Sequence, residues 1–397
     1  MNRYHSYLNT AVKLIGLYKK GEPLHLHLKK HFAANKKMGS RDRKVVADLC
    51  YSYFRLKLML PAGVEIQQQI LIAAFVCGKD ASVVANSIHP EWMLIKEWPL
   101  TEKMQHFQIS GPESLPFYNQ LSSSIQQEAF CQSLLRQPNV FIRVRPGYLR
   151  TISARLQERG IAYEKISEHS LSVTQGSKLD DHLRLNKEAV IQDDSSRQVF
   201  DSVIAEINNR AKLGDGVLDV WDVCAASGGK SILFHDQYVG SMKLTVSDIR
   251  ENMLGNLSQR LTEAGINLYR KFSADVTAKV PLGSDERFDV VICDVPCSGS
   301  GTWARTPEQY AFYGDADLAR YTEQQRKITL NAARFLKDDG WLIYITCSAF
   351  ASENENNVKL ICKTGQLICM HENYLTGYAK AADTLYCAVL KKPINLL

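Results

Sequence analysis

From Gly216 to the C-terminus, apolar strand-like runs alternate with helical segments, and this alternation constrains the fold more than any other feature of the chain. The clearest runs cover residues 217–224, 243–248, 288–294 and 341–347. Their apolar residues are nearly continuous, which is typical of parallel strands covered by helices on both faces. We therefore predict an α/β domain with a mostly parallel, Rossmann-like sheet. Ligands of such sheets bind at the carboxyl ends of the strands.

The first third of the chain has a different pattern. Residues 1–100 carry apolar side chains at helical spacing, as at Leu8, Ala11 and Ile15. We predict an all-helical module over 1–100, with Ser40 as the N-cap of one of its helices. A helical connector is expected over 101–137.

Positive charge is concentrated in this helical module. The 397-residue chain has a formal net charge of +6, yet residues 1–60 hold 13 Lys and Arg against three acidic residues. A local basic excess indicates contact with a polyanion. A solvated helical face explains the same composition equally well.

The pattern changes again near Val140. Residues 141–145 read F-I-R-V-R, a strand-like alternation of apolar and basic side chains, and a helix and two further strands are expected up to residue 173. We predict a small α/β subdomain over 138–190, followed by the α/β domain over 191–397. The alternate arginines have a simple alternative explanation, which is an exposed sheet face.

Membrane and metal functions find no support in the sequence. The longest apolar run, from Ile70 to Cys77, has eight residues, whereas a bilayer-spanning helix needs about 20. The ten cysteines form no C-x-x-C pair and no His/Cys cluster at zinc spacing, so we predict no metal site. Scattered cysteines fit a reduced, cytoplasmic protein.

A glycine-containing loop, C-A-A-S-G-G-K-S (224–231), follows the first apolar run and opens a helix. A P-loop would need glycine at position 224, which is Cys224, and the G-x-G-x-x-G fingerprint of dinucleotide sites is absent. An adenosyl ligand without a pyrophosphate remains, such as S-adenosyl-L-methionine. The loop residues assigned to this cofactor are Cys224, Ala225, Ala226, Ser227, Gly228, Gly229 and Lys230.

Three acidic residues join this cofactor site. Asp248 ends the second apolar run, where a carboxylate can accept both hydroxyls of a ribose. Asp275, in S-A-D-V, is expected to meet the adenine edge, and Asp294 ends the third run. Each carboxylate alone could be a helix cap. Their order at successive strand ends favours the cofactor.

Two cysteines complete the candidate site. Cys297 lies in D-V-P-C-S-G-S-G (294–301), three residues after Asp294 on a turn stiffened by proline. Cys347 lies in Y-I-T-C-S (344–348), at the carboxyl end of an apolar run. A thiol in a polar cleft can be shifted into its nucleophilic thiolate form. Cys293, inside an apolar run, is expected to be a core thiol.

Together these motifs resemble the Fmu/Sun (RsmB-like, Nop/Sun) family of RNA cytosine-5 methyltransferases over nearly the whole chain. The family's D-x-C-A-A-P-G-G-K, D-A-P-C-S-G and T-C-S motifs are similar to residues 222–230, 294–299 and 346–348. Its Q-D-x-x-S and R-x-P-E elements look like residues 192–196 and 305–308. The chain departs from the family in having Ser227 for proline, Val295 for alanine and Arg145 for asparagine.

The resemblance implies an activity and a role for each site residue. The reaction is methylation of carbon 5 of cytidine in RNA, with 16S-type ribosomal RNA as the expected substrate. Cys347 is the expected nucleophile, Asp294 recognises the cytosine, and Cys297 is the expected base in product release. Chemistry on a ring face needs an unstacked base, so a flipped cytosine in single-stranded or loop RNA is expected.

The resemblance also implies partners. The helical module is similar to a NusB-like RNA-binding domain and residues 138–190 to an RNA-recognition-like subdomain, and the chain is expected to act as a monomer. The expected RNA contacts are Arg41, Arg43, Lys44, Arg143, Arg145 and Arg305.

Rival interpretations stay open at this point. In a DNA cytosine-5 methyltransferase, the thiol of the Pro-Cys motif would attack, which makes Cys297 the nucleophile and leaves Cys347 without a role. A non-catalytic RNA-binding factor for ribosome assembly could retain the fold, although both thiols and the carboxylates are present. A small-molecule methyltransferase would leave the first 200 residues without a purpose.

Overall fold

The computed structural model describes residues 3–174, 176–213 and 216–394 and divides into two compact units. The helical unit comprises Met1–Gln137 and Thr302–Gly314, and the α/β unit comprises Pro138–Gly301 and Asp315–Leu397. None of the helices in the described part of the chain is long and apolar enough to cross a membrane.

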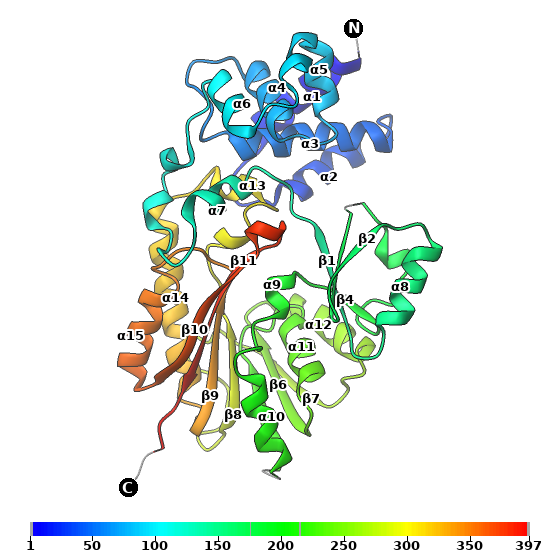
Figure 1. Ribbon diagram of the computed structural model, residues 1–397. Helices are drawn as coiled ribbons and strands as arrows, with labels where there is room; N and C mark the ends of the chain where they lie inside the picture. Colours follow the sequence, from blue (N-terminus) through cyan, green and yellow to red (C-terminus); the bar gives the residue numbers. More distant parts are fainter. Residues whose placement is uncertain (1–2, 175, 214–215, 395–397) are drawn as a thin grey trace. The chain divides into compact units, whose positions relative to one another are not determined.

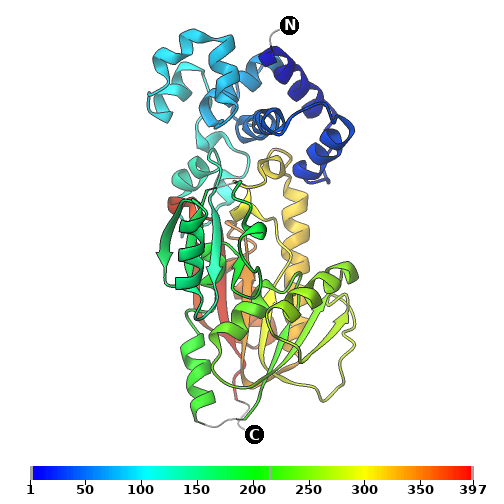
Figure 2. The same ribbon diagram turned by 90° about the vertical axis from the view of Figure 1, so that its right-hand side faces the viewer.

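The helical unit is built as its apolar spacing predicts (Figures 1 and 2). The segment expected as a connector, residues 101–137, belongs to the same unit. Its helices are α1 (Arg3–Leu17), α2 (Leu24–Ala34), α3 (Ser40–Leu56), α4 (Ile66–Cys77), α5 (Ser82–Ile88), α6 (Leu100–His106), α7 (Gln127–Ser133) and α13 (Pro307–Tyr310), with short 3-10 helices at Pro90–Ile95, Pro112–Ser114 and Tyr118–Gln120.

The start of α3 differs from the prediction by one residue. Gly39, and not Ser40, is the N-cap, and its backbone N–H donates to the Asp42 carboxylate at 3.2 Å. The carboxylate of Asp42 satisfies this amide from inside the first turn, so the helix needs no hydroxyl cap.

Residues 302–314 join the helical unit although the chain on both sides of them belongs to the α/β unit. Arg55, 2% exposed, donates from Nη2 to the carbonyl oxygen of Ala304 at 2.9 Å. The hydroxyl of Tyr310, which is fully buried, donates to the carbonyl oxygen of Arg55. No local signal in the sequence predicts this long-range packing.

The small subdomain contains an antiparallel sheet with one covering helix and lies within the α/β unit. The strands lie in the order β2-β3-β1-β4, and Ile152 and Leu156 of the helix pack on Ile142 and Leu171. Its elements are β1 (Val140–Val144), α8 (Leu149–Glu158), β2 (Tyr163–Ser167), β3 (Ser170–Val173), a 3-10 turn at Leu179–Asp181, and β4 (Ala189–Ile191).

The large sheet has seven strands in the order β10-β11-β9-β8-β5-β6-β7. The five from β9 to β7 are parallel, and β11 and β10 add an antiparallel edge. This is the mostly parallel Rossmann-like sheet that the apolar runs predict. Its strands are β5 (Leu218–Asp222), β6 (Met242–Asp248), β7 (Tyr269–Ser273), β8 (Phe288–Asp294), β9 (Leu336–Thr346), β10 (Ile368–Thr376) and β11 (Thr384–Lys391).

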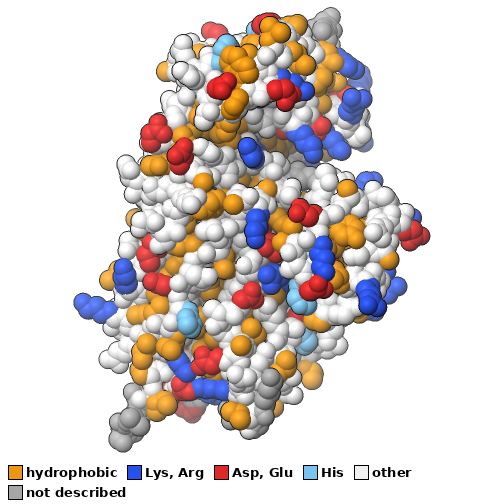
Figure 3. All heavy atoms as spheres, in the orientation of Figure 1, with side chains coloured by type: hydrophobic (Ala, Val, Ile, Leu, Met, Phe, Trp, Pro, Cys, Tyr) orange, Lys and Arg blue, Asp and Glu red, His pale blue; other side chains and the backbone are white. Residues whose placement is uncertain are grey.

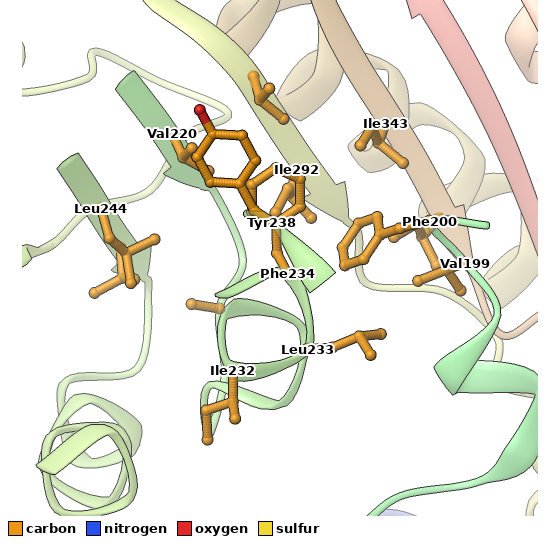
Figure 4. Close-up of a cluster of buried hydrophobic side chains, with 14 of the residues drawn as sticks. Val199, Phe200, Val220, Ile232, Leu233, Phe234, Tyr238, Leu244, Ile292 and Ile343 are labelled. Atoms are coloured by element: carbon orange, nitrogen blue, oxygen red, sulfur yellow. The ribbon is translucent and has the colours of Figure 1, made fainter. Parts of the chain in front are cut away.

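Helices cover both faces of this sheet, because side chains of each strand alternate between two cores (Figure 1). Val290 and Ile292 of β8 enter the core that contains Leu233 and Phe234 (Figure 4), while Val291 and Cys293 enter the opposite core. Cys293 is fully buried there, as expected. The remaining helices are α9 (Asp194–Arg197), α10 (Ile204–Lys212), α11 (Gly229–Gln237), α12 (Glu251–Glu263), α14 (Asp315–Ala333) and α15 (Glu355–Gly365), with 3-10 turns at Ser300–Thr302 and Tyr378–Lys380.

Candidate active site

Four neighbouring parallel strands, β9, β8, β5 and β6, end at the same edge of the sheet. Asp222 ends β5, Asp248 ends β6, Asp294 ends β8, and Cys347 directly follows β9. The parallel register therefore gathers residues that are up to 125 positions apart in the chain.

The loop after β5 is shaped by two residues with positive φ, Ala226 (46°) and Gly228 (83°). Gly228 is the N-cap of α11, and a Cβ there would lie 3.4 Å from Leu257. Glycine avoids both the backbone strain and this crowding. The turn leaves the first amides of α11 directed at the sheet edge, where they can donate to a ligand.

Asp248 holds the other side of this loop. It is 4% exposed and accepts hydrogen bonds from the backbone N–H of Ala226 at 3.0 Å and of Arg250 at 2.9 Å, and from the Arg250 guanidinium. Burial alone would disfavour the charged form, but the Arg250 and Ala226 contacts outweigh it and lower the pKa of Asp248. Asp248 is thus held as an acceptor-only carboxylate.

Asp222, the last residue of β5, is a site residue that the sequence analysis did not assign to the cofactor. It is fully buried; Oδ2 accepts from Ser231 Oγ at 2.6 Å, and Oδ1 has no hydrogen-bond partner among the described residues. Burial raises the pKa of Asp222 to about 7. A buried acceptor without a partner is costly in the protein alone and suits a donor from a ligand.

The expected cofactor fits these groups. S-adenosyl-L-methionine carries an ammonium group, for which the orphaned oxygen of Asp222 is a matching acceptor. Its ribose hydroxyls match the Asp248 carboxylate. Asp275 is exposed in the loop after β7, where its Oδ1 accepts from the Thr277 N–H at 2.9 Å and hydroxyl at 2.6 Å in a local turn.

Lys230, one of the residues expected at the cofactor, pairs with Asp294, which was expected at the same site. Its Nζ lies 3.0 Å from Asp294 Oδ2 and donates to Ser196 Oγ at 2.8 Å. Burial disfavours the ammonium form, but the charge and hydrogen bond of Asp294 outweigh it, so the pKa of Lys230 is raised; the neighbouring Cys347 adds to this. The lysine therefore stays charged beside the candidate catalytic residues.

The two candidate cysteines lie side by side. Their Sγ atoms are 3.5 Å apart, and the backbone N–H of Gly301 donates to the carbonyl oxygen of Cys347 at 3.0 Å. A Cβ on Gly301 would collide with the carbonyl oxygen of Thr384, so only glycine permits this close approach. The hydrogen bond of Cys347, burial, and the charges of Cys347 and Glu353 raise the pKa of the Cys297 thiol well above its ordinary value. Cys297 is therefore a neutral thiol at rest.

Ser227, which replaces the family's proline, has a partner of its own. Arg260 of α12 donates from Nη1 to Ser227 Oγ at 2.5 Å and to its carbonyl oxygen at 3.0 Å. The same guanidinium donates from Nε to Asn186 of the small subdomain at 2.9 Å. The loop that a proline would stiffen is here restrained by an arginine.

Arg143 of β1 and Arg145, which directly follows this strand, are not placed to bind RNA. Arg143, 2% exposed, and Arg145 both pair with Asp236 of α11, the latter at 2.7 Å. Arg145 also donates to the carbonyl oxygen of Ala264 at 2.8 Å. This burial corrects the expected RNA contact at both positions, because β1 packs against the α/β domain through the face that carries them.

The other expected RNA contacts lie in the helical unit. Arg41 and Lys44 are exposed on α3, and Lys and Arg side chains gather over α2 and α3 (Figure 3). Arg43 is half-buried and donates from Nε to the carbonyl oxygen of Met38 at 2.8 Å. Arg305 is half-buried in the 302–314 segment.

A Rossmann-like sheet with a glycine loop after its first strand and carboxylates at the adjacent strand ends is the arrangement of a nucleoside-type cofactor site, as found in S-adenosylmethionine-dependent methyltransferases. Residues 213–382 match the family described as 16S rRNA methyltransferase RsmB/F. This domain is therefore of the Fmu/Sun type, which confirms the resemblance drawn from its motifs. Methyltransferases of this family use S-adenosyl-L-methionine, which confirms the expected cofactor.

Individual relatives agree with this assignment. A probable ribosomal RNA small subunit methyltransferase B of Bacillus subtilis is 26% identical over 279 residues, covering 69% of this chain and 55% of the relative. The chain thus spans about half the length of the curated relatives it matches.

Two solved structures share the fold. PH0851 has a TM-score of 0.69 at 18% identity and covers 97% of this chain and 98% of its own. NSun6 from Pyrococcus horikoshii, solved with SFG, has a TM-score of 0.57 at 14% identity, with 70% of this chain and 96% of its own covered.

Proposed function

We propose that this protein methylates carbon 5 of cytidine in RNA with S-adenosyl-L-methionine as the methyl donor, and that 16S-type ribosomal RNA is the substrate. One observation carries the proposal: the Sγ atoms of Cys297 and Cys347 lie 3.5 Å apart, next to the Lys230–Asp294 ion pair. Two thiols in contact suit a reaction in which one bonds to the ring and the other helps it leave. The match to the RsmB/F family and the likeness to NSun6, solved with the S-adenosylmethionine analogue SFG, support the reaction class.

Cys347 attacks carbon 6 of the cytosine. Carbon 5 is a weak nucleophile until a thiolate adds at the neighbouring carbon and makes the ring electron-rich. Lys230 supplies positive charge beside Cys347, where the attacking sulfur would carry negative charge. Cys297 keeps its proton at rest, because its contact with Cys347 and its burial raise the pKa of its thiol.

Asp294 recognises the base. In the proposed complex its carboxylate, held by Lys230 at 3.0 Å, would accept from the exocyclic amine of cytosine and lie beside ring nitrogen 3. Charge that develops on the ring after thiolate addition is then stabilised by the Lys230–Asp294 pair.

The bound cofactor supplies an electrophilic methyl group for carbon 5. Asp222 would hold the ammonium group of the cofactor, and Asp248 would hold its ribose. Asp275 would contact its adenine edge, and the backbone of residues 224–230 would contact the remainder of the cofactor. Arg250 covers Asp248 with a bidentate contact, so its guanidinium moves aside when the ribose binds.

Cys297 acts as the base in product release. The Cys347 thiol is the main cause of its raised pKa, and this cause disappears once the Cys347 sulfur is bonded to carbon. The pKa of Cys297 then falls, so that it can release its proton to solvent and, as a thiolate, accept the proton on carbon 5. As that proton leaves, the carbon–sulfur bond breaks and Cys347 departs as a thiolate.

Two substitutions test these roles. Cys347→Ala removes the nucleophile and is expected to abolish methyl transfer without forming an adduct. Cys297→Ala retains the attack but blocks release, so the enzyme is expected to stay on RNA as a covalent species that survives a denaturing gel. Cys369→Ala, an exposed thiol away from the site, is the matched control and is expected to behave like the wild type. An adduct with Cys347→Ala instead would reverse the assignment.

The substrate needs its own measurement. Labelled methyl transfer to matched RNA and DNA oligonucleotides separates RNA from DNA, and bisulfite mapping of RNA from cells with and without the protein identifies the nucleotide. We expect a flipped cytosine in single-stranded or loop RNA. The exposed Arg41 and Lys44 of α3 are proposed contacts to its phosphates. We further propose that the protein acts in the cytoplasm as a monomer.

A further inference from the structure

A fully buried carboxylate lies between the two loops that carry the candidate cysteines. It belongs to Glu353, in the short segment between β9 and α15. Glu353 Oε1 accepts from the Ser298 N–H and from Gln325 Nε2, each at 2.8 Å. Oε2 accepts from the hydroxyls of Ser298 and Ser348, each at 2.5 Å. All four donors are uncharged amide or hydroxyl groups.

The partners of Glu353 are adjacent to the reacting thiols in the chain. Ser298 follows Cys297, and Ser348 follows Cys347. Because the two loops come from different strands, their relative position depends on contacts between them, and the carboxylate bridges them with one oxygen. Ser300 adds a second link, since its hydroxyl lies 3.1 Å from Ser348 Oγ.

We propose that Glu353 is a positioning residue that holds the loops of Cys297 and Cys347 in the relative position that the reaction requires. The proposal rests on the proposed function, because only that reaction gives both thiols a role. Glu353 itself would touch neither the RNA base nor the cofactor, and would act through Ser298 and Ser348.

The carboxylate is itself held in place. Gln325 is fully buried and donates from Nε2 both to Glu353 and to the carbonyl oxygen of Pro296, the latter at 3.0 Å. The hydroxyl of Tyr344, also fully buried, donates to the carbonyl oxygen of Glu353 at 2.6 Å. A residue fixed from behind in this way can impose a position on the loops it contacts.

The geometry predicts different effects for two substitutions. Glu353→Ala removes all four hydrogen bonds and leaves the Ser298 N–H and two hydroxyls without their buried acceptor. Glu353→Gln keeps an oxygen for Ser298 N–H and Gln325, while its amide can donate to the two serine hydroxyls, which can rotate to accept. The glutamine variant therefore preserves the bridge between the loops and loses the charge.

Steady-state kinetics is the first test. For Glu353→Ala we expect kcat to fall by about 100-fold, because the two thiols would be misplaced by on the order of 1 Å. The KM values for RNA and for the cofactor are expected to change less than about 3-fold. The kcat of Glu353→Gln is expected to be at least about 10-fold higher than that of Glu353→Ala. The matched control is Glu355→Ala, two residues away, whose carboxylate accepts from the Tyr374 hydroxyl and contacts neither serine in the bonds described; its kcat is expected to stay near the wild-type value.

The second test does not depend on methyl transfer. Diamide oxidises two adjacent thiols to a disulfide by taking one hydrogen atom from each, and the rate reports how often the sulfurs meet. We expect Glu353→Ala to slow formation of the Cys297–Cys347 disulfide by about 10-fold, measured by peptide mass spectrometry, and Glu353→Gln to restore it. If wild-type protein shows no methyl transfer on any RNA, the proposed function fails, while this rate still tests the position of the loops.

Two results would overturn the proposal. One is a Glu353→Ala variant that keeps the wild-type kcat and disulfide rate. The other is a fall in kcat and in the disulfide rate that also occurs in Glu355→Ala, or that Glu353→Gln does not reverse. If Glu353→Ala does not fold, Ser348→Ala takes its place, because it removes one hydrogen bond from the bridge; kcat and the disulfide rate must then fall together.

Discussion

Asp222 shows how a single residue can be costly for the free protein and useful for its ligand. The carboxyl group is fully buried, one of its oxygens has no partner in the described structure, and burial raises its pKa to about 7. A bound ammonium group would restore the charged form and supply the missing donor. Binding of the cofactor as proposed would therefore offset the cost of burying this acid.

The raised pKa of Asp222 has a defined effect on stability in cofactor-free protein. The folded state binds a proton more tightly than the unfolded state, so stability is lost as pH rises from about 4 to about 7. Asp222→Asn removes this loss, because it stays neutral and can still accept from Ser231. We expect the stability of the variant relative to wild type to grow by about 1.4 kcal/mol per pH unit in that window. Urea denaturation at pH 5.5 and 8.5 measures the difference, and a pH-independent difference would contradict the assignment.

At the scale of elements, the join between β1 and α11 depends on one buried acid. Asp236 is paired with both Arg143 and Arg145, and Arg143 also donates to Gln192 Oε1 at 2.6 Å. The small subdomain is thus held to the large one by charges that are withdrawn from solvent. A buried pair of this kind specifies an arrangement more than it adds net stability.

Removing Asp236 should therefore be far worse than removing an exposed acid. Asp236→Ala leaves two buried guanidinium groups unpaired, and we expect the α/β unit to lose about 3–5 kcal/mol of stability in urea denaturation. Glu168→Ala, which breaks the exposed Lys165–Glu168 pair, is the control and is expected to cause no measurable change. Equal effects of the two substitutions would mean that the Asp236 pairs are not structural.

At the scale of the whole molecule, the chain crosses between its two units more often than its sequence pattern indicates. Residues 302–314 leave the α/β unit directly after the loop of Cys297 and complete the core of the helical unit. Tyr310, Trp303 and Phe117 pack together there, with ring centroids 5.0 Å apart for Phe117 and Trp303. The helical unit therefore needs residues from the far half of the chain to fold completely.

The dependence on this segment can be measured by hydrogen exchange. Tyr310→Ala empties a fully buried aromatic site, and we expect the helical unit to lose about 3–5 kcal/mol. The amides of α3 and α13 should lose protection, while those of β8 and β9 keep theirs. Gln309→Ala, an exposed neighbour, should leave both sets unchanged. Loss of protection in β8 and β9 instead would show that residues 302–314 belong to the α/β unit.

The sequence by itself was sufficient for the class of fold and for the residues gathered at the strand ends. Apolar runs of strand length indicate strands that are buried on both faces. Because parallel strands bring their carboxyl ends to one edge of a sheet, the sequence alone predicts that Asp248, Asp294 and Cys347 lie close together. The helical nature of residues 1–100 followed from local spacing in the same way.

Only the tertiary structure decided which partners these side chains have. The Lys230 ammonium pairs with Asp294, the side chains of Arg143 and Arg145 pair with Asp236, and Glu353 joins two loops from different strands. No periodic spacing in the sequence predicts these contacts. Hydrogen bonds and ion pairs depend on distances between side chains, and those distances are set only when the elements pack. Periodicity in the sequence determines elements and their faces, whereas the packing of those elements determines the chemistry of the site.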